Sequence, residues 1–323
     1  MYQERFLYDT IPARPSCHAG TILELPSGEF LAAFYAGTRE GAPDVAVLTA
    51  RLRSELDDWS ELTTVIDTPG KSEGNPVLHV DTYGHVWLFY VTQQEPGWDY
   101  VLLYAMKSED EGRTWEEPVP LSEEQGWMVR NKPIRLRSGR TVLPCYDEVN
   151  WRGFCLVSDD ECVTWRRSGW MEGPVTVIQP TLIERPDGSI LALLRNGAPE
   201  DRPEHRVLWQ SVSTDGGMNW SLCEPTELPN PDSGADMTGL DSGNAVLVYN
   251  DTKKGRSPLT VALSEDGGRT WPIRRNLETE PAEFSYPAVI QHLDGNINAL
   301  YTYKRTHMKH VIFDEAWVRG EDE

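Results

Sequence analysis

Short apolar segments separated by turn residues run along the whole chain. Residues 86–91, 190–194 and 245–249 are uninterrupted apolar runs, each bounded by glycine or polar turn residues. Such runs are typical of strands that are buried on both faces. Prolines and glycines interrupt the chain throughout, and no helical periodicity persists for three turns. The pattern therefore predicts an all-β protein.

Six pairs of these segments are joined by a turn glycine, and the six turns recur at nearly one period. The glycines are 56, 55, 49, 55 and 52 residues apart: Gly28, Gly84, Gly139, Gly188, Gly243 and Gly295. Six evenly spaced hairpins predict six four-stranded sheets, so the expected fold is an all-β, six-bladed β-propeller. Because the repeat covers nearly the whole sequence, we expect residues 1–323 to form a single domain.

A second motif, S-x-D-x-G-x-T-W, alternates with the hairpins. Residues 108–115 and 264–271 match it at every fixed position, 213–220 has Asn in place of Thr, and 158–165 lacks only the glycine. Trp59 ends a degenerate fifth copy. Each copy is interpreted as a tight hairpin in which Asp caps backbone N–H groups, Gly takes a positive φ and Trp packs between neighbouring repeats. The motif lacks the ligand spacing of a calcium loop.

The amino-acid composition restricts the kinds of partner that the protein is expected to bind. The 323 residues include 30 Lys and Arg against 51 Asp and Glu, a formal net charge of −21, which argues against nucleic acid and anionic membrane surfaces. The N-terminus lacks a signal-like apolar stretch, and no run is long enough to span a bilayer. Five cysteines without a C-x-x-C pair suggest neither disulfides nor zinc. We expect a cytoplasmic protein without a metal or cofactor, and the oligomeric state stays open.

The chemistry is expected where the innermost strands converge. Reading back from each turn glycine to the start of its strand gives six polar residues: His18, Asn75, Lys132, Gln179, Asp236 and Tyr286. An apolar residue would be the usual choice at the start of a buried strand. Six polar side chains facing a common axis therefore predict a lined pocket.

Three further segments make the resemblance to a known family specific. Arg195 follows Leu193-Leu194 and leads into the motif at 213–220, Arg256 leads into the motif at 264–271, and Tyr286 stands in Phe-Ser-Tyr-Pro. With these residues in this order, nearly the whole chain resembles the sialidase (neuraminidase) superfamily of Asp-box, or BNR-repeat, propellers. The resemblance implies that Arg195 and Arg256 are the second and third members of an arginine triad that binds the substrate carboxylate. It also implies that Tyr286 is the nucleophile.

Two positions depart from the family pattern. The first arginine of the triad is expected where His18 stands, and the glutamate that assists the tyrosine is expected at Gln179, which cannot take a proton. Asp44, in Gly-Ala-Pro-Asp, is the residue to which the resemblance assigns the acid/base role. Cys-His-Ala-x-Thr, followed by 37–44 with Arg39, resembles the divergent branch labelled predicted neuraminidase. It is also similar to propellers that act on rhamnosyl-glucuronate linkages.

These residues leave three functions open. The first is a glycosidase that acts on a carboxylated sugar, either sialic acid-like or a uronate, with Arg195 and Arg256 binding the carboxylate. The second is a uronate lyase in which either His18 or Tyr286 removes the proton next to the carboxylate and the other residue serves the leaving group. The third is a glycan-binding propeller without catalysis. In each case the partner is an acidic oligosaccharide or glycoconjugate, contacted also by Arg39, Asn75, Lys132, Gln179 and Asp236.

Overall fold

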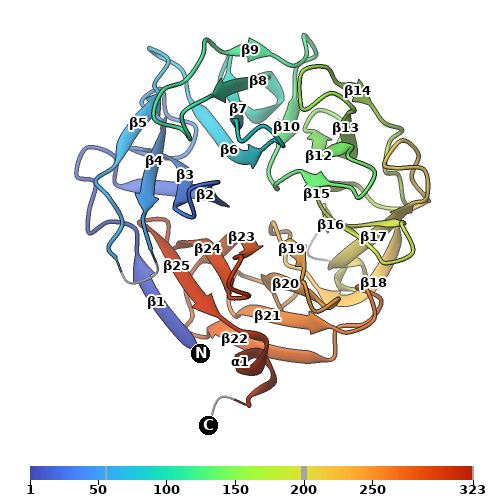
Figure 1. Ribbon diagram of the computed structural model, residues 1–323. Helices are drawn as coiled ribbons and strands as arrows, with labels where there is room; N and C mark the ends of the chain where they lie inside the picture. Colours follow the sequence, from blue (N-terminus) through green and yellow to red (C-terminus); the bar gives the residue numbers. More distant parts are fainter. Residues whose placement is uncertain (55–56, 198–201, 322–323) are drawn as a thin grey trace.

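The computed structural model describes residues 1–54, 57–197 and 202–321. Within these residues almost all regular secondary structure is β-strand, as predicted, and the strands form five antiparallel sheets with one parallel pair. The sheets are arranged around a common centre, with β2, β6, β15, β19 and β23 innermost (Figure 1). None of the helices in this described part is long and apolar enough to cross a membrane.

The first two sheets along the chain each consist of four consecutive strands. The first sheet contains β2 (Ser16–Glu24), β3 (Phe30–Gly37), β4 (Ala46–Leu52) and β5 (Thr63–Ile66). The second contains β6 (Glu73–Val80), β7 (Val86–Gln93), β8 (Val101–Ser108) and β9 (Val119–Pro120). The 3-10 helices η1 (Trp98–Tyr100) and η2 (Pro203–His205) lie in connecting segments.

The longest sheet has two parts. Its first part contains β10 (Trp127–Val129), β11 (Ile134–Arg135), β12 (Thr141–Asp147), β13 (Arg152–Ser158) and β14 (Arg166–Arg167). Its second part contains β15 (Val177–Glu184), β16 (Ile190–Asn196), β17 (Val207–Ser213) and β18 (Glu224–Pro229). One parallel pair, Arg152 with Val177, joins them, so the two parts are otherwise separate antiparallel units.

The last two sheets bring the ends of the chain together. One contains β19 (Asp236–Gly239), β20 (Ala245–Asn250), β21 (Leu259–Ser264) and β22 (Ile273–Glu278). The other contains β23 (Phe284–Gln291), β24 (Ile297–Tyr303), β25 (His307–Phe313) and the N-terminal β1 (Tyr2–Phe6), with α1 (Glu315–Arg319) after it. Because Tyr2 pairs with Phe313, the N-terminal strand completes the sheet that the C-terminal strands begin, and both termini lie on the same side of the ring (Figure 1).

The repeated motif forms the turns that were predicted for it. In 264–271, the Asp266 carboxylate accepts from the Thr270 amide at 2.9 Å and from the Thr270 hydroxyl at 2.6 Å, while Ser264 Oγ accepts from the Gly268 amide at 2.8 Å. Gly268 has a φ of 78°, and Cys162, which replaces this glycine in 158–165, takes the same left-handed conformation with a φ of 67°. The tight turn thus persists without glycine, at the steric cost of a side chain with positive φ.

The tryptophans of these turns pack against the preceding sheet. Trp165 makes an edge contact with Phe89 of β7 at 5.7 Å between ring centroids, and Trp271 lies in one apolar cluster with Leu191 of β16. Trp59 contacts His310 of β25, as expected for a degenerate copy of the same motif. These contacts remove apolar surface from water between sheets, so each sheet is stabilised by its neighbour.

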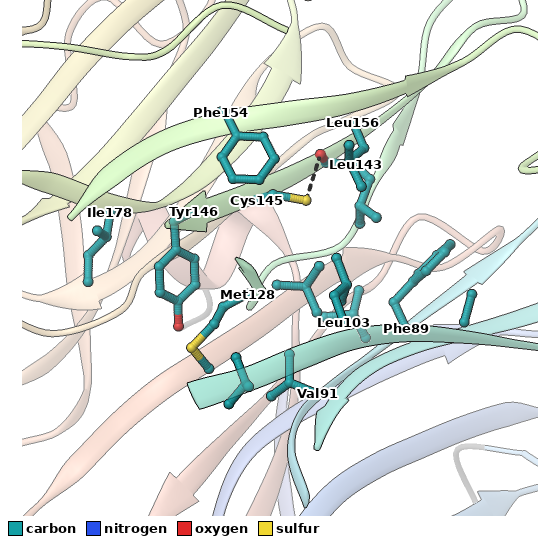
Figure 2. Packing of buried hydrophobic residues seen from close by; sticks show 14 of the residues in the cluster. Phe89, Val91, Leu103, Met128, Leu143, Cys145, Tyr146, Phe154, Leu156 and Ile178 are labelled. Atoms are coloured by element: carbon teal, nitrogen blue, oxygen red, sulfur yellow. Dashed lines mark hydrogen bonds between the residues drawn. The ribbon is translucent and has the colours of Figure 1, made fainter. Parts of the chain in front are cut away.

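One such apolar cluster supports a wall of the central site. It joins β7 and β8 to β12 and β13 and includes Phe89, Leu103, Phe154 and Leu156 (Figure 2). Figure 2 shows Tyr146 at one side of this cluster, beside Ile178. The interior of the cluster is fully buried, and close-packed side chains of this kind permit little displacement of the residues at its margin.

Candidate active site

A polar cavity of about 290 Å³ lies at one end of the central axis. Its lining combines three arginines, two glutamates, three tyrosines and two amides with a tryptophan and a methionine: Arg195, Arg256, Arg305, Glu40, Glu148, Tyr35, Tyr146, Tyr286, Asn75, Gln179, Trp98 and Met128. Of the ten residues predicted for the site, five line this cavity: Tyr286, Arg195, Arg256, Gln179 and Asn75.

A shared irregularity of the inner strands directs three of these side chains to the cavity. Asn75, Gln179 and Tyr286 have φ values of 44°, 53° and 53°, and each stands where the strand register shifts by one residue and immediately before a proline. β2 has the same shift, with Ala19 at the positive φ. Bulges re-aim side chains next to active sites, and strained backbone persists where the surrounding structure enforces it.

Tyr286 has hydrogen-bond donors at its hydroxyl and cations beside its ring. Its Oη accepts a hydrogen bond from Arg195 Nη1 at 2.5 Å and one from Gln179 Nε2 at 3.3 Å. The guanidinium groups of Arg130 and Arg256 lie 5.0 and 5.2 Å from the ring centroid. Cations around a phenol oxygen and its ring stabilise negative charge that develops on that oxygen.

The three arginines are oriented by carboxylates behind them. Arg195 Nε donates to Asp232 at 2.5 Å, whereas Arg256 and Arg305 both donate to Glu283 Oε1, at 2.8 and 2.6 Å. Burial opposes ionisation of Glu283, but the two arginines hold its pKa below the ordinary value. Among the described residues, the Nη2 group of each cavity arginine has no hydrogen-bond partner. The three guanidinium groups therefore keep N–H donors for an anionic ligand.

His18 lies behind the cavity lining. Its ring packs against that of Tyr286, with 4.1 Å between centroids, and its Nδ1 is 2.9 Å from Thr302 Oγ1. Complete burial, together with Arg305, Arg256, Arg130 and Arg195, lowers the pKa of His18 well below its usual value. The imidazole is therefore neutral and supports the tyrosine ring.

Asp44 and Arg39 lie on the loop after β3, outside the cavity lining. Both oxygens of the half-buried Asp44 carboxylate accept hydrogen bonds from Thr38, at 3.0 Å from its amide and 3.0 Å from its hydroxyl. The Arg39 side chain is exposed, and its carbonyl accepts from Ala42. The acid of this loop that does reach the cavity is Glu40, which is paired with Arg305.

The half-buried Lys132 and the buried Asp236 form an ion pair away from the cavity lining. Lys132 Nζ donates to Asp236 Oδ2 at 2.7 Å, and the same carboxylate accepts from Thr181 Oγ1 at 2.7 Å and from the Val289 amide at 2.8 Å. Asp236 is 1% exposed. With all of these donors satisfied inside the protein, the pair links three inner strands.

Four charged residues in or beside the cavity were not predicted, and neither were the lining tyrosines Tyr35 and Tyr146. Arg305 lies in the turn between β24 and β25 with a φ of 61°, and Glu40, Glu148 and Arg130 lie in segments outside the repeat motifs. Arg130 is 2% exposed, and burial lowers its pKa while Asp236 opposes that effect. In the described part of the chain, no group of three or more His, Cys, Asp or Glu could hold a metal ion.

Comparison with known proteins places the chain in a family. The model of the BNR repeat-like domain matches residues 28–299. The chain belongs to the BNR repeat-like domain family of the sialidase superfamily. A sialidase of Micromonospora viridifaciens is 27% identical over 350 residues, which cover 95% of the chain but 52% of that relative. The chain thus spans about half of the length of this relative.

Solved structures share the fold of this BNR repeat-like chain. The Hadza microbial sialidase Hz136 superposes with a TM-score of 0.83 at 17% identity, over 98% of this chain and 69% of that one. The leech intramolecular trans-sialidase, complexed with 2,7-anhydro-Neu5Ac, superposes with a TM-score of 0.82 at 15% identity, over 98% and 70% of the two chains.

Proposed function

We propose that this chain is a sialidase-like glycosidase, built as one six-bladed β-propeller domain, that releases a terminal carboxylated sugar from an acidic glycan. The supporting observation is the meeting of Arg195, Arg256 and Arg305 with Tyr286 in one cavity. The relatives named sialidase support the reaction class. A cavity of about 290 Å³ suits one sugar ring, which favours action at the end of a glycan.

The arginines would bind the carboxylate of the sugar through their Nη2 donors. Arg256 and Arg305 share Glu283, so their guanidinium groups are fixed relative to one another, and Arg195 is fixed by Asp232. Preorganised donors of this kind bind a carboxylate without further ordering of their own side chains. This role was assigned to two arginines from the sequence, and Arg305 is the third that we propose.

Tyr286 would attack the anomeric carbon. Its phenolic proton would pass to solvent water, because Gln179 beside it cannot accept a proton and Arg195 stabilises the charge left on the oxygen. The bond from the anomeric carbon to the leaving oxygen would break as the bond to the tyrosine forms. Water would then release the sugar, and the tyrosine would recover a proton from solvent.

The geometry favours this hydrolase over the lyase that uses His18. A lyase needs a base in contact with the C–H next to the carboxylate, whereas His18 is 2% exposed and is separated from the cavity by the ring of Tyr286. The arrangement of donors around Tyr286 Oη likewise favours an enzyme over a binding module, since binding needs no oriented phenol.

The test is turnover of three substrates: an aryl sialoside, a sialyllactose and a rhamnosyl-glucuronate disaccharide. Free sugar and the absorbance of an unsaturated uronate are followed together. We expect release of sialic acid or of a related acidic sugar without new absorbance. New absorbance with the uronate would refute hydrolysis in favour of elimination, and binding without turnover of any substrate would favour the non-catalytic propeller.

A further inference from the structure

Two carboxyl groups line the cavity, and they differ in their partners. Glu40 is in an ion pair with Arg305, which holds its carboxylate at the arginine cluster. Glu148 is half-buried and, unlike Glu40, its side chain forms no hydrogen bond or ion pair with any residue that the structure describes. Glu148 is therefore the cavity carboxyl whose oxygens remain free for a ligand.

The backbone that carries Glu148 is held firmly in place. Glu148 follows β12, and its amide donates to the Gly126 carbonyl at 2.8 Å. The Asp147 carboxylate accepts from the amides of Val149 and Asn150, at 2.9 and 3.1 Å, and from the Asn150 side chain at 2.7 Å. This turn fixes the hairpin end, so the carboxyl is presented to the cavity from a rigid element, as a catalytic group requires.

The charges around Glu148 come from four elements. Arg195 of β16 is the cation, while Asp232 after β18, Asp99 of η1 and Asp147 of β12 are anions. Burial raises the pKa of Glu148 to about 7, with Arg195 opposing this effect and the three aspartates adding to it. A carboxyl group in this state carries a proton in a large fraction of molecules at neutral pH, as a proton donor must.

We propose that Glu148 is the acid/base catalyst of the site, an assignment that rests on the glycosidase function proposed above. As Tyr286 bonds to the anomeric carbon, the glycosidic oxygen leaves with the bonding electron pair and takes the proton of Glu148. The resulting carboxylate then accepts a proton from the water that attacks the anomeric carbon and displaces Tyr286. Glu148 thus ends the cycle protonated, and the net reaction consumes one water. In this assignment Asp44, whose carboxylate accepts two hydrogen bonds from Thr38, is not the acid.

The experiment compares leaving groups that need a proton with leaving groups that do not. Glu148→Gln and the matched control Glu40→Gln each neutralise one cavity carboxyl. Both are assayed on sialyllactose, whose leaving group is an alcohol, and on an aryl sialoside, whose leaving group is an acidic phenol. We expect Glu148→Gln to lower kcat on sialyllactose by about 10²–10⁴-fold and on the aryl sialoside by less than about tenfold. Glu40→Gln should affect both substrates alike.

A second readout separates catalysis from structure. Glu148→Ala, supplied with azide and the aryl sialoside, is expected to recover turnover and to form a glycosyl azide, because a small anion can enter the space left by the carboxyl group. Equal losses on both substrates, or no loss on either, would overturn the assignment of Glu148. If the wild-type protein turns over neither substrate, the glycosidase proposal itself fails and the assignment falls with it.

Discussion

Replacing Tyr286 by phenylalanine separates catalysis from folding. The change removes a hydroxyl that accepts from Arg195 at 2.5 Å and from Gln179 at 3.3 Å, while the ring contacts with His18 and Arg130 remain. A hydrogen bond to a charged group contributes about 1.5–3 kcal/mol, so the free energy of unfolding should fall by about 2 kcal/mol. Loss of the nucleophile should lower kcat by about 10⁴-fold or more.

Three measurements check this expectation: kcat on an aryl sialoside, denaturant unfolding, and calorimetric titration with an acidic monosaccharide. The affinity should change by less than about threefold, because we propose that the arginines, rather than Tyr286, bind the carboxylate. Tyr146→Phe is the matched control: its hydroxyl lies in the same cavity and accepts from Asn75 at 3.1 Å and Gln179 at 3.3 Å. It should keep kcat within about tenfold. Activity of Tyr286→Phe within tenfold of wild type would refute the proposed nucleophile.

Four other expectations follow from the contacts of single residues. Arg305→Met should raise KM for carboxylated substrates by about 10–100-fold, as measured by Michaelis kinetics. An unchanged KM would show that Arg305 does not bind the substrate carboxylate. Asp44→Asn should keep kcat within about threefold, and a large loss would restore it as the acid. Asp236→Asn leaves the half-buried Lys132 without its carboxylate partner, so that its Nζ keeps only the Met237 carbonyl. The free energy of unfolding, measured in urea, should fall by about 1–3 kcal/mol, and no change would show that the ion pair is dispensable. Between about pH 4.5 and 7 the folded protein keeps a proton on Glu148 that the unfolded chain releases. The free energy of unfolding should therefore fall by up to about 3 kcal/mol as the pH rises through this range. In Glu148→Gln this difference between the free energies of unfolding at pH 5 and pH 8 should disappear.

The repeated turns were predictable because their chemistry is local. The Asp266 caps, the positive φ of Gly268 and the packing of Trp271 each depend on a few neighbouring residues, and all were predicted correctly. The pairing of β1 with β25 was not predicted, because it joins segments about 300 residues apart without any repeated motif. Register between distant strands depends on tertiary packing and leaves little trace in a single sequence.

A position on an inner strand predicted part of the site, whereas the cavity residues Glu40, Glu148 and Arg305 lie in loops or turns and were missed. Asn75, Gln179 and Tyr286 each precede a proline on an inner strand, and all three line the cavity. Lys132 and Asp236 were selected by the same reading, but they satisfy one another on the axis. The sequence cannot distinguish a polar side chain that faces a ligand from one that faces another inner strand, because both occupy the same position in the repeat.

Arg305 supplies a third arginine for the proposed binding of an anion, although the family arginine is absent at His18 and the chain carries a net charge of −21. It comes from the last sheet and shares Glu283 with Arg256, so its position depends on tertiary structure. Each cavity arginine is paired with a carboxylate, and the local net charge is therefore small. What remains for the proposed substrate is a set of oriented N–H donors. Recognition of the carboxylate then depends on geometry, which a strongly acidic protein can supply as well as a basic one.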